Sequence, residues 1–147
     1  MNTYTLLKNR HQKEVDAFLS KYAFFAFNNE QFARGLEKLG IQEGQEGALV
    51  RLSNTGGFVL KERAPEFVAM LKKHSDEQRA ALSDPEAGYT FAYNMFVYEL
   101  SNHEYGFTGD AGETLDALGM TEDDIAADPV LQRALEAAEK DVIGDCY

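Results

Sequence analysis

The stretch YTFAYNMFVYEL, Tyr89–Leu100, is the most apolar segment of the sequence and decides the fold that we predict. Its apolar side chains would cover most of the circumference of a helix, and the flanking residues extend that helix over roughly residues 86–103. A helix that is apolar all round is stable only when other elements bury it. We therefore expect this segment to form a central helix with the rest of the chain packed around it.

On the N-terminal side, local signals predict three further helices. Apolar residues at helical spacing mark a first helix over residues 3–22. Asn28 or Asn29 can cap a second helix, and Gly40 suits its left-handed C-terminal end. Pro65 suits the first turn of a third helix, and Leu71 is among the residues whose spacing predicts an inward-facing side chain.

On the C-terminal side, the signals predict short helices followed by a longer one. The run LDAL forms a short helix that Gly119 closes. Thr121 with Asp124 resembles a capping box, in which Asp replaces the usual Glu. Asp128 and Pro129 start the last helix, which we expect to reach about residue 143.

Two short β-prone runs, ALVRL (48–52) and FVLKE (58–62), are joined by SNTGG, which supplies residues that hairpin turns require. A lone hairpin is marginally stable in water. The run AFFAF (23–27) is a strand or a buried connector, and as a strand it would widen this sheet. We therefore predict a predominantly helical α+β fold, in which five to six helices and a small antiparallel sheet form one domain over residues 1–147.

Cysteine usage and hydropathy indicate the cellular compartment in which we expect the protein. The single cysteine, Cys146, excludes an intramolecular disulfide and a four-cysteine metal site, and a reducing compartment is the simplest fit. The sequence has no signal-peptide pattern and no run near the roughly 18 apolar residues that a membrane span needs. We therefore expect a cytoplasmic protein that does not enter membranes.

Negative charge is concentrated in one segment of the chain. The net charge is −11, and residues 80–132 hold eleven Asp or Glu and no Lys or Arg. Such a surface repels phosphate backbones and attracts basic partners, so direct nucleic-acid binding is disfavoured. The alternative is a surface that only maintains solubility. The residues that we predict to bind a basic protein surface are Asp110, Glu113, Asp116, Glu122, Asp123, Asp124 and Asp128.

The end of the central helix holds a histidine between two carboxylates. Glu99 and His103 are four residues apart and share a helical face, so both could bind one cation with Glu104 or with Asp110 or Glu113 from the following loop. Magnesium or manganese would suit these oxygen ligands better than zinc. The alternatives are a histidine that closes the helix terminus, which we favour, and acid–base catalysis.

The sequence lacks the common catalytic and nucleotide-binding motifs. The sequence contains no GxSxG, P-loop, GxGxxG or HExxH pattern. His11 and His74 lie on helical faces and are interpreted as packed or surface residues. The aromatic runs FFAF and YTFAYNMFVY could stack on bases, but we interpret them as core because no basic residues accompany the second run. We accordingly predict neither an enzyme nor an organic cofactor.

Three blocks of the sequence resemble a known family. They are FFAFNNEQFARGLEKLG, MFVYELSNHEYGFTGD and TLDALGMT, and the similarity extends over nearly the whole chain. The sequence resembles a family of short acidic proteins of unknown function that bacteria and their phages encode. The resemblance implies a single-domain protein from a mobile element, and it implies no activity, substrate or catalytic residue.

From these observations we expect a non-enzymatic interaction protein. Its acidic segment would bind the basic, nucleic-acid-binding surface of a partner and would inhibit it by imitating phosphates. The competing hypothesis is a metal- or small-ligand-binding protein, such as a hydrolase, built on Glu99, His103, Glu104 and Asp110. A third possibility is a housekeeping protein with neither property.

Overall fold

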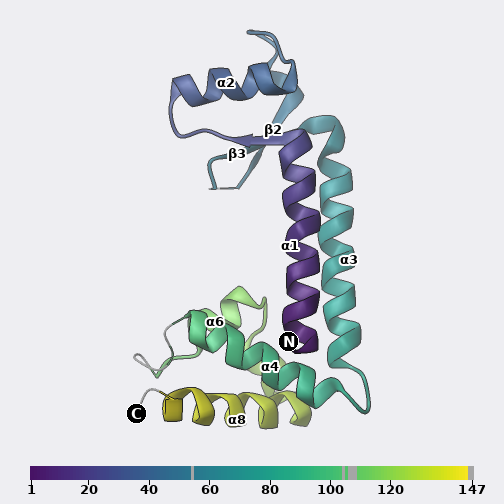
Figure 1. Ribbon diagram of the computed structural model, residues 1–147, viewed down its shortest axis with the longest axis vertical. Coiled ribbons are helices and arrows are strands. Elements are labelled where there is room, and N and C mark those ends of the chain that lie inside the picture. The colour runs from purple at the N-terminus through teal and green to yellow at the C-terminus, as the bar shows by residue number, and fades with distance from the viewer. Residues whose placement is uncertain (54, 104, 106–108, 146–147) are drawn as a thin grey trace. The chain divides into compact units, whose positions relative to one another are not determined.

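The computed structural model describes residues 1–53, 55–103, 105 and 109–145 (Figure 1). The chain folds into two compact units. Residues 1–8 and 77–147 form one, here called the terminal unit, and residues 9–76 form the other, here called the inner unit. Helices α1 (Thr3–Tyr22) and α3 (Ala64–Leu82) contribute residues to both units. Each unit is therefore described by itself, and the single domain that we predicted stays a prediction.

The centre of the terminal unit is α4 (Gly88–Asn102), which lies alongside α8 (Pro129–Asp145) (Figure 1). Two shorter helices, α6 (Gly112–Ala117) and α7 (Glu122–Ala126), and parts of α1 and α3 also belong to this unit. Met95, Phe96 and Leu100 of α4 are fully buried. The prediction of an aromatic central helix is confirmed, although Tyr89 and Tyr98 remain 40% and 37% exposed.

Polar side chains begin α7 and α8 as the sequence predicts. The backbone N–H of Asp124 donates to Thr121 Oγ1 at 3.1 Å, and that of Thr121 donates to Asp124 Oδ2 at 2.9 Å. This is the predicted capping box, and it starts α7. Asp128 accepts a hydrogen bond from the Val130 N–H at 2.9 Å and so starts α8.

The inner unit contains a three-stranded antiparallel sheet of order β1-β3-β2. The hairpin strands are β2 (Leu49–Leu52) and β3 (Gly57–Leu60), and β1 (Ala23–Phe25) pairs with β3. The AFFAF run is therefore the third strand, and the predominantly helical α+β fold is confirmed. Two short 3₁₀ helices, η1 (Glu46–Ala48) and η2 (Lys61–Arg63), flank the hairpin.

One face of this sheet is covered by α2 (Asn29–Leu39), which the Asn28 side chain caps and Gly40 ends with φ 71°. The Phe24 ring stacks on Phe58, with centroids 5.4 Å apart, and reaches α2 at Gly35. A Cβ atom at Gly35 would lie 2.0 Å from that ring, so the close approach of α2 to β1 requires glycine. β1 therefore packs closely against α2 and contributes Phe24 to the core of the inner unit.

Two predictions about side chains of the inner unit were wrong. The aromatic run FFAF was expected to be core, but Phe25 is 49% exposed and Phe27 is 77% exposed. Successive side chains of a strand point to opposite faces, so Phe24 is buried against α2 and Phe25 is not. Leu71 of α3, which we expected to face inward, is 43% exposed.

Within the described residues, no helix combines the length and the apolar character that crossing a bilayer demands.

Candidate functional site

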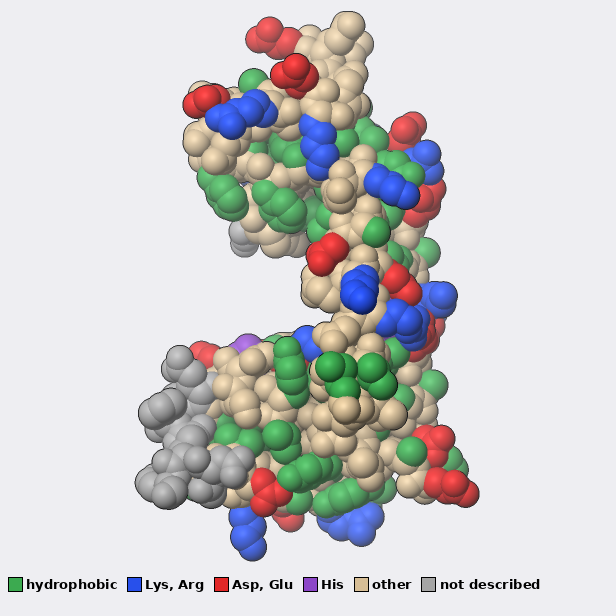
Figure 2. Space-filling view, in the orientation of Figure 1, with side chains coloured by type: hydrophobic (Ala, Val, Ile, Leu, Met, Phe, Trp, Pro, Cys, Tyr) green, Lys and Arg blue, Asp and Glu red, His purple; other side chains and the backbone are tan. Residues whose placement is uncertain are grey.

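The two units differ strongly in charge. The terminal unit contains 16 Asp or Glu and four Lys or Arg, a net charge of −12. The inner unit contains nine acidic and ten basic residues, a net charge of +1. Over the inner unit, Figure 2 shows Lys and Arg interleaved with Asp and Glu. The whole excess of negative charge therefore belongs to the terminal unit.

Four of the seven predicted partner-binding residues are exposed and carry uncompensated charge. They lie on the two short helices of the terminal unit, Glu113 and Asp116 on α6 and Glu122 and Asp123 on α7. Within the part of the chain that the structure describes, none of them forms a salt bridge or a side-chain hydrogen bond. These four carboxylates are therefore available to a partner.

The other three predicted partner-binding residues have local structural roles. Asp124 and Asp128 cap α7 and α8, and Asp110 Oδ1 accepts a hydrogen bond from the Gly112 N–H at 2.8 Å, just before α6. A carboxylate at a helix N-terminus is stabilised by the free N–H groups of the first turn. Capping explains the presence of Asp124 and Asp128, and a local hydrogen bond explains that of Asp110, although Asp110 and Asp124 remain exposed at the surface.

Glu99, the first predicted metal ligand, is only 4% exposed and is held by residues from α1. Its Oε1 atom accepts a hydrogen bond from the Tyr4 hydroxyl at 2.6 Å and forms a salt bridge with Lys8. Burial, followed by this hydrogen bond and the negative charge of Glu99, raises the pKa of Tyr4. The Lys8 ammonium also lies 4.7 Å from the centre of the Tyr98 ring. A lysine cation thus neutralises the buried carboxylate.

The second predicted metal ligand, His103, ends the central helix. Its backbone N–H donates to the Glu99 carbonyl at 3.0 Å, and its Nε2 atom lies 3.7 Å from Glu99 Oε2. The geometry fits the helix-terminus interpretation of this pair. Glu104 lies outside the described residues, and among those described no group of three or more His, Cys, Asp or Glu could hold a metal ion. The cation site therefore stays a prediction.

A histidine pair in the inner unit connects α1 to α3. The rings of His11 and His74 are stacked with centroids 3.8 Å apart, and His74 Nε2 lies 2.5 Å from Glu14 Oε2. The hydrogen bond with His74 lowers the pKa of Glu14. The sequence left packed and surface positions open for these histidines, and the structure shows that they pack against each other. Sequence spacing alone did not pair them.

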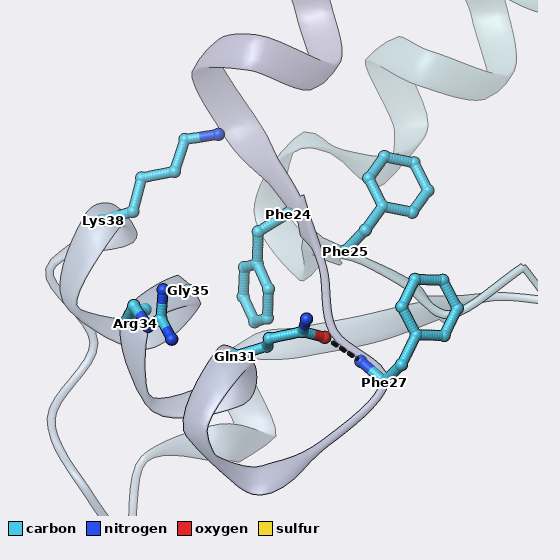
Figure 3. Close-up of a pocket in the computed structure, with 7 residues that line it drawn as sticks. All are labelled: Phe24, Phe25, Phe27, Gln31, Arg34, Gly35 and Lys38. Carbon is cyan, nitrogen blue, oxygen red and sulfur yellow. Dashed lines mark hydrogen bonds between the residues drawn. The ribbon is translucent and has the colours of Figure 1, made fainter.

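A groove that sequence reasoning missed lies between β1 and α2 in the inner unit (Figure 3). It has a volume of about 310 Å³. Its walls are backbone and side chains of Phe24, Phe25, Phe27, Gln31, Arg34, Gly35 and Lys38. Arg34 and Lys38 are one turn apart on α2, which was the available signal, but only the pairing of β1 with β3 shows which strand they face.

Comparisons with known proteins give a family without a function. The model of a family of unknown function, DUF7659, matches residues 3–141, so the chain belongs to that family. No curated protein and no solved structure matches the chain.

Proposed function

We propose that this member of a family of unknown function is a non-enzymatic interaction protein whose terminal unit binds a basic surface of a partner protein. The observation that supports this proposal most directly is the net charge of the terminal unit, which is −12, whereas that of the inner unit is +1. A field of one sign accelerates encounters with oppositely charged surfaces and excludes partners of like charge. It also opposes direct binding to nucleic acid.

The predicted contact surface consists of the exposed carboxylates of α6 and α7. Glu113 and Asp116 lie on α6, and Glu122 and Asp123 lie on α7, two helices that only the loop 118–121 separates. No salt bridge within the described residues neutralises these side chains. Lys or Arg of a partner can therefore form ion pairs with them without breaking existing pairs. Asp110, Asp124 and Asp128 add negative charge at the adjoining helix starts.

The partner class that fits this chemistry is a nucleic-acid-handling enzyme. Its binding groove presents Lys and Arg at positions that hold phosphates, and a row of carboxylates can occupy the same positions. The protein would then act as an inhibitor that competes with DNA or RNA. A phage or another mobile element that must resist such an enzyme is the natural source of such a protein, and the cytoplasm is its natural location.

The test is the salt dependence of binding to a captured basic partner. The full chain is used to isolate partners from a host lysate, and affinity is then measured by titration calorimetry from about 50 to 200 mM salt. We expect affinity to fall at least tenfold over this range and nucleic acid to displace the protein. Binding that does not depend on salt, or a partner that nucleic acid cannot displace, would contradict the proposal.

A matched pair of variants separates local charge from total charge. The first carries Glu113→Gln, Asp116→Asn and Asp123→Asn in the terminal unit, and the second carries Glu37→Gln, Glu43→Gln and Glu62→Gln in the inner unit. Both lower the net negative charge equally. We expect only the first to weaken partner binding, by about tenfold or more for three lost charge contacts. Equal effects would mean that only the net charge matters.

A further inference from the structure

We propose that the groove between β1 and α2 binds an extended acidic peptide segment of a partner, which adds to the free edge of β1 as a fourth strand. The order β1-β3-β2 makes β1 an edge strand. An edge strand presents unpaired N–H and C=O groups to which another chain can bind. This binding surface lies in the inner unit and is independent of the acidic surface proposed above.

The hydrogen bonds of β1 show which backbone groups face the open edge. The Ala26 N–H donates to the Gly56 carbonyl at 2.9 Å, and Phe24 pairs with Phe58 two residues earlier. In an antiparallel pair, hydrogen-bonded and non-hydrogen-bonded positions alternate. The N–H and C=O groups of Phe25, which lies opposite Gly57, therefore point away from β3 toward the groove.

Helix α2 occupies both ends of this edge and leaves its middle open. The Lys38 ammonium donates to the Ala23 carbonyl at 2.7 Å. The Phe27 N–H donates to Gln31 Oε1 at 2.7 Å, as Figure 3 shows. Within the described residues, neither backbone group of Phe25 forms a hydrogen bond. An added antiparallel strand could therefore exchange two hydrogen bonds with Phe25, while Lys38 and Gln31 limit the contact to a short segment.

The charge of the groove selects an acidic occupant. Its lining includes two cations, Arg34 and Lys38, and no Asp or Glu. Arg34 is paired with Glu30 at 2.7 Å, but both side chains are mostly exposed, and such surface pairs are weak and exchangeable. The Lys38 ammonium keeps two donors beyond the one that binds Ala23. A carboxylate on the occupant would therefore find two donors on α2.

The alternation of a strand then predicts the order of side chains in the peptide. In Figure 3 the Phe24 ring points toward α2, whereas the rings of Phe25 and Phe27 point away from it. A residue opposite Phe25 places its side chain on the face of the exposed Phe25 ring, and its two neighbours point toward α2. The preferred peptide is thus apolar at the residue opposite Phe25 and acidic at the residues before and after it.

Selection from a random heptapeptide library displayed on phage tests this inference with the full chain as bait. We expect enriched peptides to share an acidic–apolar–acidic pattern without proline. Fluorescence anisotropy with one selected peptide, labelled and synthesised free of phage, then gives its affinity. If no peptide is enriched, or if the enriched peptides lack acidic residues, the inference is wrong.

Variants of the edge separate backbone recognition from side-chain recognition. Phe25→Ala removes the ring and keeps the N–H, whereas Phe25→Pro also removes the N–H, and proline is tolerated on a strand edge that faces away from its partner. We expect Phe25→Ala to weaken the selected peptide several-fold and Phe25→Pro to weaken it at least about tenfold more. Equal affinities of the two variants would exclude strand addition. Circular dichroism and thermal melting confirm that each variant is folded.

Charge variants of α2 complete the test. Lys38→Gln and Arg34→Gln should each weaken the peptide by about tenfold, as expected for a hydrogen-bonded ion pair, whereas Lys73→Gln on α3 should not. The variant with three neutralised acids in the terminal unit should bind the peptide as the wild type does. Failure of this inference therefore leaves the proposed function intact, and the reverse also holds. Unchanged peptide affinity in Lys38→Gln would overturn the inference.

Discussion

The terminal and inner units both bury apolar side chains but differ in how their surface charges are paired. In the terminal unit, Met95, Phe96 and Leu100 of one helix are fully buried, and the exposed carboxylates of α6 and α7 form no salt bridge within the described residues. The inner unit instead has a small sheet and a nearly balanced surface, on which ion pairs link neighbouring turns of its helices. These pairs are Arg10–Glu14, Arg34–Glu30, Arg63–Glu66 and Lys72–Asp76.

This difference shows how much the charged side chains of each unit contribute to stability. Surface ion pairs one helical turn apart contribute only about 0.3–0.5 kcal/mol each, so the inner unit gains modest stability from its charge balance. In the terminal unit, like charges gain nothing from one another, although several carboxylates have structural roles. Asp124 and Asp128 cap helices, and Glu99 and Glu139 accept hydrogen bonds from tyrosine hydroxyls. The remaining carboxylates of α6 and α7 form no salt bridge within the described residues. Glu113, Glu122 and Asp123 lie in the first turns of these helices, where the helix dipole favours negative charge, and they also belong to the partner surface that we propose.

The largest expected effect tests the core of the terminal unit. Phe96→Ala removes a ring that is 0% exposed. Large-to-small changes of this kind lower the free energy of unfolding by about 3–5 kcal/mol, because the lost burial adds to the cost of a cavity. Native-state hydrogen exchange should show the loss at the amides of α4 and α8.

Lys73→Gln on the surface of the inner unit is the control for that variant and should change the free energy of unfolding by less than about 0.5 kcal/mol. If Phe96→Ala were equally mild, Phe96 would not be central to the terminal core. The contrast between a unit held by apolar burial and a unit with a balanced surface would then be lost.

An intermediate effect concerns pH, to which Tyr4 of the terminal unit and Glu14 of the inner unit respond in opposite directions. In the terminal unit, burial and Glu99 raise the pKa of Tyr4 above its ordinary value of 10.0. Above about pH 10 the unfolded chain loses the Tyr4 proton while the folded chain keeps it, so stability falls as pH rises, by up to about 1.4 kcal/mol per pH unit. Tyr4→Phe should remove this part of the alkaline decline.

Tyr105 behaves similarly over a narrower range. Burial, followed by the hydrogen bond that its hydroxyl donates to Glu139, raises its pKa to about 12, so its contribution to stability is lost between about pH 10 and 12.

In the inner unit, the hydrogen bond with His74 lowers the pKa of Glu14 below its ordinary value of 4.5, and the contribution of Glu14 to stability is lost as the pH falls below 4.5. Hydrogen exchange of each unit across pH, with phenolate absorbance as the titration signal, checks both directions. An alkaline decline unchanged in Tyr4→Phe would contradict this account.

How far the sequence predicted this molecule depends on the range of each interaction. Asn28, Gly40 and the Thr121–Asp124 box act within one turn, so helix ends could be predicted from neighbouring residues. The partners of Glu99 lie 95 and 91 residues away, at Tyr4 and Lys8, and no local pattern indicates them. The acidic segment of the candidate site was evident from composition alone.

The groove was missed for a similar reason. It exists because β1 pairs with β3 across more than 30 residues and because Gly35 lets α2 approach the Phe24 ring. Periodicity shows that Phe25 and Phe24 face opposite sides of a strand, but it does not show which side a helix covers. Division of the chain into two units is likewise a property of long-range contacts, and the sequence shows no linker between them.

The smallest expected effect addresses the charge contrast itself. Asp116→Lys on α6 and Glu37→Lys on α2 each replace a negative charge with a positive one near the C-terminal end of a helix. The helix dipole therefore acts similarly on both new lysines. In the terminal unit the new lysine has acidic neighbours, so it should raise stability by about 0.3 kcal/mol more than in the inner unit. That difference should disappear at about 1 M salt, where the screening length is about 3 Å. Urea unfolding at low and high salt measures both quantities. Equal stabilisation by the two lysines at low salt would mean that the terminal carboxylates are too far apart to form a common field, and the proposed partner surface would lose its basis.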